Sequence, residues 1–126
     1  MPELNQQWIG VDLDGTLAYA EDFHGEEVIG PPIPAMVERV KDWLRQGEVV
    51  KIFTARASSA AAIQEIKAWL QKAGLPDLDV TNVKDHLMKL CYDDKAIQVA
   101  KNTGRVVGEK EMRAESHWEA FARLMG

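Results

Sequence analysis

The sequence predicts an α/β fold with a mostly parallel sheet, and three observations support this prediction. Short apolar runs alternate with longer stretches whose apolar residues recur at helical spacing. Glycine and proline separate these segments, and a polar cluster follows each apolar run. The chain has 126 residues, enough for one domain with a substantial core and too few for two, so we predict a single domain over residues 1–126.

Each segment of the first half carries a local signal. The first strand is expected over residues 8–13, where an apolar run leads into two carboxylates. Residues 18–33 are rich in glycine, proline and acidic side chains, which predicts a loop or short flap after that strand. Pro34 suits the first turn of a helix, and Gly47 is a typical stop after its apolar stripe. The apolar run at residues 49–53 predicts the second strand.

The same alternation continues in the second half. Ser58 or Ser59 can cap a second helix. Its buried stripe would consist of Ala62, Ile63, Ile66, Trp69, Leu70 and Ala73. Short runs at residues 79–83 and 88–92 predict a third and a fourth strand.

The pattern is weaker beyond residue 94. The apolar residues 97–99 and 105–107 flank a turn sequence, which is typical of a hairpin, but a short helix through Ala96 is also compatible with the pattern. Ser116 and Glu119 form a capping-box pair, which predicts a final helix.

Composition restricts the classes of function. The net charge of −5 disfavours non-specific nucleic-acid binding, which requires basic surfaces, so no nucleic-acid partner is expected. No apolar run is long enough to cross a bilayer and no targeting segment is recognisable, so we expect a cytoplasmic protein without membrane contact. The single cysteine, Cys91, leaves no intramolecular disulfide, and its place in an apolar strand predicts a core position.

The polar clusters that follow the strands form a chemically coherent set. Because the carboxyl ends of parallel strands meet at one edge of a sheet, four distant clusters can converge there. In chain order they are Asp12 and Asp14, Thr54-Ala55-Arg56, Lys84, and Asp93-Asp94. Carboxylates can attack phosphorus, hydroxyl and N–H groups can hold phosphoryl oxygens, and an ammonium group can offset the charge. Several carboxylates beside a phosphate need a cation, and an all-oxygen ligand set favours Mg²⁺.

The segment Asp12-Leu13-Asp14-Gly15-Thr16 matches an Asp-x-Asp-x-Thr pattern, and the later clusters supply Thr, Lys and an acidic pair in that order. This ordered set resembles the motifs of the haloacid dehalogenase (HAD) superfamily over roughly four fifths of the chain. The resemblance implies a three-layer α/β/α sandwich with a Rossmann-like sheet. It also implies Mg²⁺-dependent hydrolysis of phosphomonoesters through an aspartyl-phosphate.

The resemblance assigns a role to each matching position. Asp12 would be the nucleophile, and Asp14 the general acid and base. Thr54, with the backbone of Ala55, would bind the phosphoryl group, and Lys84 would stabilise its charge. Mg²⁺ would be held by the Asp12 carboxylate, the Asp14 backbone carbonyl and the Asp93 carboxylate, with Asp94 as a nearby or water-mediated ligand.

Two lysines are candidates for the site. Lys89 also precedes Asp93, but four strand steps of about 3.3 Å would place it roughly 13 Å away, towards the opposite edge of the sheet. Lys84 follows the third strand at the productive edge and is therefore favoured, although it lies unusually few residues before the acidic pair. Arg56 and His24 are candidates for contact with the substrate, and a solvated or salt-bridged side chain is the alternative for Arg56.

The resemblance also concerns the cap domain that many HAD enzymes insert. Neither gap between the motifs is long enough for one, so the chain looks like a capless member with a flap at residues 18–33. Its open crevice would accept a large phosphorylated substrate, or would be covered by a second subunit. Phe23, His24 and Glu26-Glu27 are the flap residues expected to discriminate substrates.

Two alternatives use the same residue types. A receiver module of a signalling system also has a phosphorylatable aspartate, an acidic metal site, a threonine and a lysine, but in a different order along the chain. A phosphotransferase, or the phosphatase part of a nucleic-acid repair assembly, is the other alternative, and the acidic charge weighs against the repair role.

Overall fold

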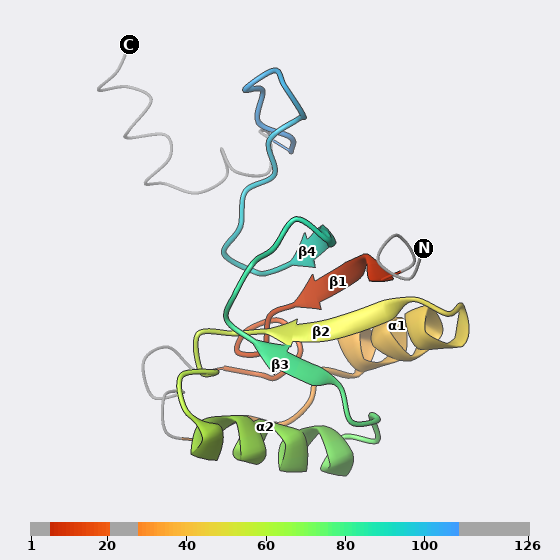
Figure 1. The fold of residues 1–126 in the computed structure, drawn as a ribbon, viewed down its shortest axis with the longest axis vertical. Helices are drawn as coiled ribbons and strands as arrows, with labels where there is room; N and C mark the ends of the chain where they lie inside the picture. Colours follow the sequence, from red (N-terminus) through yellow and green to blue (C-terminus); the bar gives the residue numbers. More distant parts are fainter. Residues whose placement is uncertain (1–5, 21–27, 109–126) are drawn as a thin grey trace. The chain divides into compact units, whose positions relative to one another are not determined.

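The computed structural model describes residues 6–20 and 28–108 and gives them an α/β fold (Figure 1). The elements are, in order, β1 (Trp8–Val11), α1 (Pro34–Arg45), β2 (Val49–Phe53), α2 (Ala60–Lys72), β3 (Asp79–Thr81) and β4 (Met88–Tyr92). The four strands form one sheet in the order β3-β2-β1-β4, and all three neighbouring pairs are parallel. The predicted α/β class and parallel sheet are confirmed.

The chain divides into two compact units, residues 1–94 and 95–126, and the first contains the sheet and both helices. In the described part of the second unit, Val99 and Val106 form an antiparallel bridge. The Val107 N–H donates to the Gln98 carbonyl at 2.9 Å, and the Ala100 N–H donates to the Arg105 carbonyl at 2.8 Å. These bonds are those of a hairpin, not of a helix through Ala96. The predicted final helix lies outside the described residues, and the single domain over residues 1–126 stays a prediction.

Both helices begin where the sequence places a start signal. Pro34 occupies the first turn of α1, where its missing N–H leaves no helical bond unmade. Ser59 caps α2, because its hydroxyl oxygen accepts the Ala62 N–H at 3.1 Å. Gly47 and Gly74 follow the two helices with φ values of +87° and +84°, a conformation that glycine adopts without strain.

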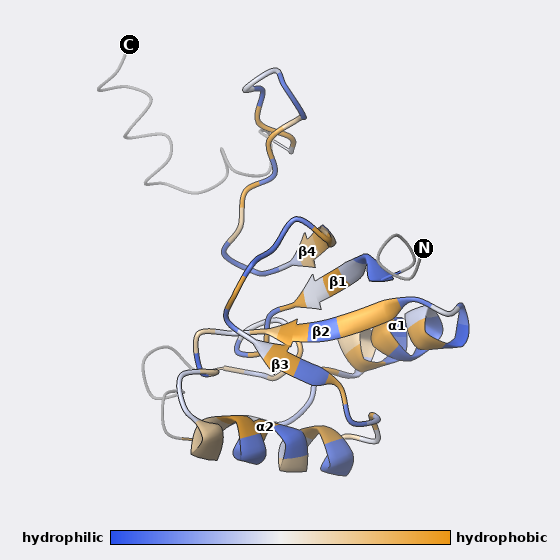
Figure 2. Cartoon of the chain, viewed as in Figure 1, coloured by the Kyte–Doolittle hydropathy of each residue, from blue (hydrophilic) through white to orange (hydrophobic). Residues whose placement is uncertain are grey.

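One face of the sheet carries the hydrophobic core. Alternate residues of the central strands, such as Ile9 and Ile52, join a single buried cluster with residues of both helices, such as Val40 and Ile66. Both helices therefore cover the same face of the sheet, as expected when two right-handed crossovers proceed in one direction. In α2 the apolar residues form a stripe between polar ones (Figure 2). Within the described residues, no helix is long and apolar enough to span a membrane.

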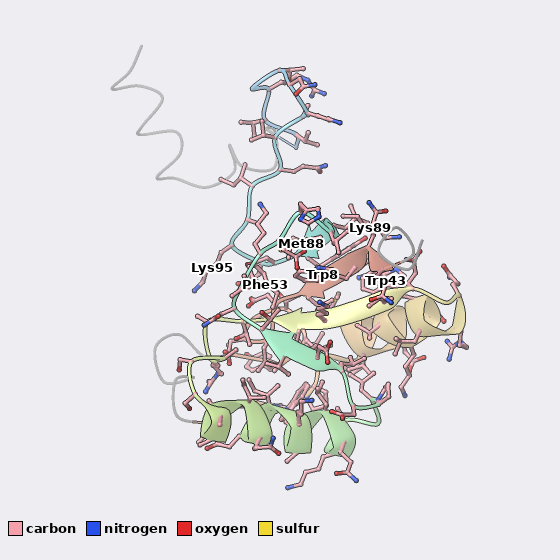
Figure 3. All side chains as sticks on the ribbon, viewed as in Figure 1. Trp8, Trp43, Phe53, Met88, Lys89 and Lys95 are labelled. Atoms are coloured by element: carbon pink, nitrogen blue, oxygen red, sulfur yellow. The ribbon has the colours of Figure 1, made fainter. Side chains whose placement is uncertain are left out.

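The opposite face of the sheet is not covered by α1 or α2 but carries large side chains of the strands themselves. Trp8, Phe53 and Met88 come from three strands (Figure 3), and Trp8 is only 1% exposed. The Trp8 indole N–H donates to Asp85 at 2.9 Å, and the Lys51 ammonium lies 4.8 Å from its ring centroid. Asp85 belongs to the short crossover 82–87 that joins β3 to β4. Within residues 6–20 and 28–94 this crossover, not a helix, follows β3, so the three-layer arrangement stays a prediction.

Cys91 is a correction to the sequence analysis. A buried core position was expected, but the thiol is exposed. The reason is the position of β4, which pairs only with β1 within the described residues and so forms an edge of the sheet. An apolar strand sequence does not distinguish an edge strand from a central strand.

The flap that follows β1 is closed at its base. The Tyr19 N–H donates to the Pro31 carbonyl at 2.8 Å, and the Ile33 N–H donates to the Leu17 carbonyl at 2.8 Å. Ala18 and Pro32 form the antiparallel bridge between them. These bonds hold the start of α1 close to the turn that follows β1.

Two neighbouring valines of β2 test the one-sided core. Val50 is 3% exposed and Val49 is 36% exposed. We expect Val50→Ala to lower the free energy of unfolding by about 2 kcal/mol, because buried methyl groups and their contacts are lost. Val49→Ala, which removes the same atoms from the same strand, should cost less than about 0.5 kcal/mol. Urea denaturation followed by circular dichroism measures both, and equal losses would contradict a core confined to one face.

Candidate functional site

The order of the strands creates a topological switch point at the carboxyl edge of the sheet. From β1 the chain proceeds to β2 and β3 on one side, whereas β4 pairs with the other side of β1. Such a change of direction is the place where open α/β sheets bind ligands. The Asp12 N–H donates to the Tyr92 carbonyl at 2.9 Å, which joins the ends of β1 and β4. Asp12 and Asp93 are therefore neighbours in space.

Three carboxylates gather at this point. Asp12, Asp93 and Asp94 each offer an oxygen, and these oxygens all lie within 4.8 Å of one another. Asp12 and Asp93 are half-buried and Asp94 is exposed. The set could hold a metal ion, because it supplies converging hard oxygen ligands.

Thr16 and Gly15 place the third carboxylate. The Thr16 hydroxyl accepts the Asp94 N–H at 2.9 Å, and it lies 3.1 Å from the Asp94 carboxylate and 3.4 Å from the Asp12 carboxylate. Its single proton can be donated to one of them at a time. Gly15, at φ +89°, leaves space for the Asp94 carboxylate, since a Cβ on residue 15 would lie 2.7 Å from Asp94 Oδ2. Thr16 is a site residue without a predicted role, although its place in the Asp-x-Asp-x-Thr pattern was the available signal.

The cluster changes the acidity of Asp12, one of its two half-buried members. Desolvation by burial, followed by the charge of Asp93 and a hydrogen bond shared with Asp94, raises the pKa of Asp12 from 3.8 to about 7. A carboxylate held in this way gains from a bound cation, which offsets the repulsion and displaces the proton. The residues present thus fit a divalent metal ion.

Thr54 ends β2 at the same edge. Its N–H donates to the Thr81 carbonyl at 2.9 Å, and the residue is only 4% exposed. The hydroxyl oxygen accepts the Arg56 N–H at 3.1 Å, so the side chain and the following turn are fixed together. Because the hydroxyl oxygen acts as the acceptor in this bond, its own proton can be donated to an anion. Ala55, in the turn, is exposed.

The Asp14 side chain lies outside the carboxylate cluster. Both of its oxygens are held by Arg56, with Nε 2.6 Å from Oδ2 and Nη2 3.0 Å from Oδ1. This two-point ion pair joins the turn after β1 to the turn after β2 across 42 positions of sequence. The predicted ligand from this residue is its backbone carbonyl, and that role stays a prediction.

The two candidate lysines are at different edges. The Lys89 ammonium (labelled in Figure 3) binds Glu48 at 2.6 Å, beside the start of β2. Lys84 is exposed on the crossover after β3. Its charge acts on Cys91, whose pKa is raised by desolvation and Asp93 and lowered by Lys84, with Asp12 raising it further. Lys84 thus shares the electrostatic neighbourhood of the carboxylate cluster.

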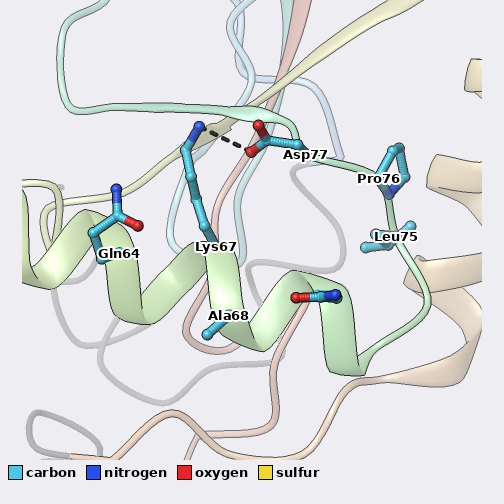
Figure 4. A pocket seen from close by; sticks show the side chains of 7 residues that line it. Gln64, Lys67, Ala68, Leu75, Pro76 and Asp77 are labelled. Atoms are coloured by element: carbon cyan, nitrogen blue, oxygen red, sulfur yellow. Dashed lines mark ion pairs between the residues drawn. The ribbon is translucent and has the colours of Figure 1, made fainter.

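One other expectation concerns the surroundings of the site. Phe23, His24 and Glu26-Glu27 lie outside the described residues. A surface hollow lies elsewhere, along α2 and the segment that leads into β3 (Figure 4), and the ion pair between Lys67 and Asp77, at 2.9 Å, borders it. Because α2 runs back from the carboxyl edge, its last turn and the start of β3 are at the opposite edge of the sheet, away from the carboxylates.

We compared the chain with protein families, curated proteins and solved structures. No protein-family model, no curated protein and no solved structure matches this chain. The interpretation of the site therefore depends on its own residues.

The raised pKa of Asp12 makes a prediction about the metal-free protein. From about pH 4 to about pH 7 the folded state keeps a proton that the unfolded chain loses, so stability falls as the pH rises through this window. We expect Asp12→Asn to stabilise the protein at pH 8 in EDTA by about 1–2 kcal/mol, a value reduced for solvent screening of a half-buried group. At pH 5, about one unit into this window, the gain should be only about a third of that at pH 8, because the folded and unfolded states differ in charge over a shorter range of pH.

Thermal unfolding of both proteins at both pH values measures this difference. Asp79→Asn, which changes an exposed carboxylate at the start of β3, is the control and should have no pH-dependent effect. A loss of stability at pH 8 in the Asp12 variant would contradict the electrostatic description of the cluster.

Proposed function

We propose that this chain is a HAD-type, Mg²⁺-dependent phosphomonoester hydrolase that works through an aspartyl-phosphate at Asp12. The observation that carries the proposal is the division of the acidic residues at one sheet edge. Asp12 lies in the cluster with Asp93 and Asp94, while Asp14, two residues later, is held apart by Arg56. One carboxylate is thereby available beside a metal ion and another is available for proton transfer.

The metal site would use Asp12, Asp93 and the backbone carbonyl of Asp14, with Asp94 nearby. The chemistry of this all-oxygen set favours a small hard cation, hence Mg²⁺. When bound, the ion would neutralise charge on the phosphoryl oxygens and on the cluster.

The protein's own groups account for two steps. First, an Asp12 carboxylate oxygen attacks phosphorus, the bond from phosphorus to the leaving-group oxygen breaks, and that oxygen takes a proton from Asp14. Second, Asp14 takes a proton from water, the water oxygen attacks phosphorus, and the bond to Asp12 breaks with release of inorganic phosphate. Asp14 ends each cycle protonated again.

Two further residues would stabilise the transferring group. Thr54 is buried, and its hydroxyl oxygen already accepts an N–H, so its proton is available to a phosphoryl oxygen. Lys84 would contribute a positive charge from the crossover. Arg56, predicted as a possible contact of the substrate, is bonded to Asp14.

The proposal also includes the substrate class, the cellular location and the covering of the site. The substrate is a phosphorylated compound that is not a nucleic acid, in keeping with the net charge of −5. A capless three-layer fold and a cytoplasmic location complete the proposal, together with an open site that accepts a large substrate or is covered by a second subunit. His24, on the flap, would contact the substrate.

The direct test is phosphate release from an aryl phosphate in the presence of MgCl₂. We expect Asp12→Asn and Asp14→Asn each to lower kcat by about a thousandfold or more, because one removes the nucleophile and the other the proton carrier. Asp79→Asn is the control and should retain full activity. Circular dichroism of each variant verifies the fold.

Three results would contradict the proposal. They are retained activity of the Asp12 variant, activity unchanged by EDTA, and a stable phosphoprotein after incubation with acetyl phosphate. The last result would favour the receiver module.

The two lysines give an independent prediction. We expect Lys84→Ala to lower kcat/KM by about 10–100-fold, because a positive charge near the transferring group is lost. Lys89→Ala should change kcat/KM by less than about twofold, because Lys89 pairs with Glu48 at the edge of the sheet opposite the carboxylates. A larger loss in the Lys89 variant than in the Lys84 variant would reverse the assignment.

A further inference from the structure

We infer that Arg56 is the positioning residue for the general acid Asp14, not a contact of the substrate phosphate. The inference rests on the proposed function, because it concerns the proton transfer that Asp14 performs there. It assigns to Arg56 one task, which is to hold the Asp14 carboxylate in one orientation at the crevice.

The contact between the two side chains has the geometry that such a task requires. Arg56 Nε and Nη2 each donate to a different oxygen of Asp14, at 2.6 and 3.0 Å. A planar guanidinium group that binds both oxygens fixes the plane of the carboxylate as well as its position. The side chains are 17% and 30% exposed, so the pair is shielded more than a surface ion pair but is still open to the crevice.

Arg56 is itself held in place. Its N–H donates to the Thr54 hydroxyl at 3.1 Å, and its carbonyl accepts the Ser58 N–H at 2.7 Å. The Thr54 N–H is bonded to Thr81 at 2.9 Å, which anchors the turn to the sheet. The guanidinium group therefore extends from a fixed turn, and the residue that anchors it is the one proposed to bind the phosphoryl group. The same turn, residues 54–56, would therefore bind the phosphoryl group through Thr54 and hold Asp14 through Arg56.

The ion pair leaves Asp14 able to act. A carboxylate has about four lone-pair directions, and the two bonds from Arg56 occupy one on each oxygen. A second direction on each oxygen stays open to the leaving group or to water. In contrast, the Arg56 Nε proton and one Nη2 proton are directed to Asp14, so these two donors are not available to a phosphate.

The identity of the leaving group separates a positioning role from a phosphate contact. An alkoxide leaving group needs a proton from Asp14, whereas p-nitrophenolate is weakly basic and leaves without one. The ratio kcat/KM reports the steps up to formation of the aspartyl-phosphate. Loss of positioning should therefore lower kcat/KM for an alkyl phosphate and leave that for p-nitrophenyl phosphate nearly unchanged.

The experiment measures Arg56→Gln and Arg56→Lys on p-nitrophenyl phosphate and on glycerol phosphate, with MgCl₂. We expect kcat/KM for glycerol phosphate to fall about 100-fold in both variants, because even a small misplacement of a catalytic group has this effect and lysine cannot bind both oxygens. With p-nitrophenyl phosphate we expect less than about a threefold change and a burst of p-nitrophenolate, since Asp14 must still activate water in the second step.

Two controls complete the design. Arg45→Gln removes an arginine whose ion pair with Asp42 is exposed on α1, and it should change neither substrate's kcat/KM. The double variant with Asp14→Asn and Arg56→Gln should be no worse on glycerol phosphate than Asp14→Asn alone, because the two residues act as one unit.

The outcomes are distinct. An equal loss of kcat/KM on both substrates, or recovery by lysine, would overturn the positioning role and make Arg56 a phosphate contact, while the hydrolase proposal would stand. A wild-type protein that hydrolyses neither substrate would overturn the proposed function and, with it, this inference.

Discussion

The hydrogen bond from the Asp12 N–H to the Tyr92 carbonyl is the constraint on which the site depends. It joins the residue that follows β1 to the last residue of β4, and these two strands are far apart in sequence but adjacent in the sheet. Because the strands are parallel, the residues that follow them leave the sheet at the same edge. The carboxylates of Asp12 and Asp93 are therefore brought together by the backbone ladder, before any side chain interacts.

This arrangement has an electrostatic cost. Acidic groups in one crevice repel one another, and the raised pKa of Asp12 reflects this repulsion together with burial. The surrounding residues compensate only in part. Thr16 bonds to the Asp94 N–H and carboxylate, and Arg56 neutralises Asp14 at a separate position. What remains is a half-buried cluster whose natural complement is a divalent cation.

Most of the fold could be predicted from the sequence. The spacing of apolar residues and the signals at Pro34 and Ser59 located the helices, and the runs at 49–53 and 88–92 matched β2 and β4. The edge position of β4 could not be predicted, because an apolar run has the same sequence whether one or two strands flank it. For this reason Cys91 was wrongly assigned to the core.

The convergence of three acidic residues could be predicted from the sequence, whereas the contacts of the site could be predicted only in part. The position of each polar cluster after a strand was sufficient to bring Asp12, Asp93 and Asp94 to one edge. The bond between Arg56 and Asp14 and the link made by Thr16 depend on the directions of side chains in tight turns. Those directions depend on local backbone angles, such as that of Gly15, which spacing alone does not determine.

The separation of the hydrophobic core from the site residues has a consequence for the evolution of such a protein. The apolar cluster occupies one face of the sheet, whereas the chemistry occupies the ends of its strands. Mutations can change the residues of these turns while the packing of the hydrophobic core stays the same. A scaffold of this kind can acquire new specificities by small steps, each selectable by itself.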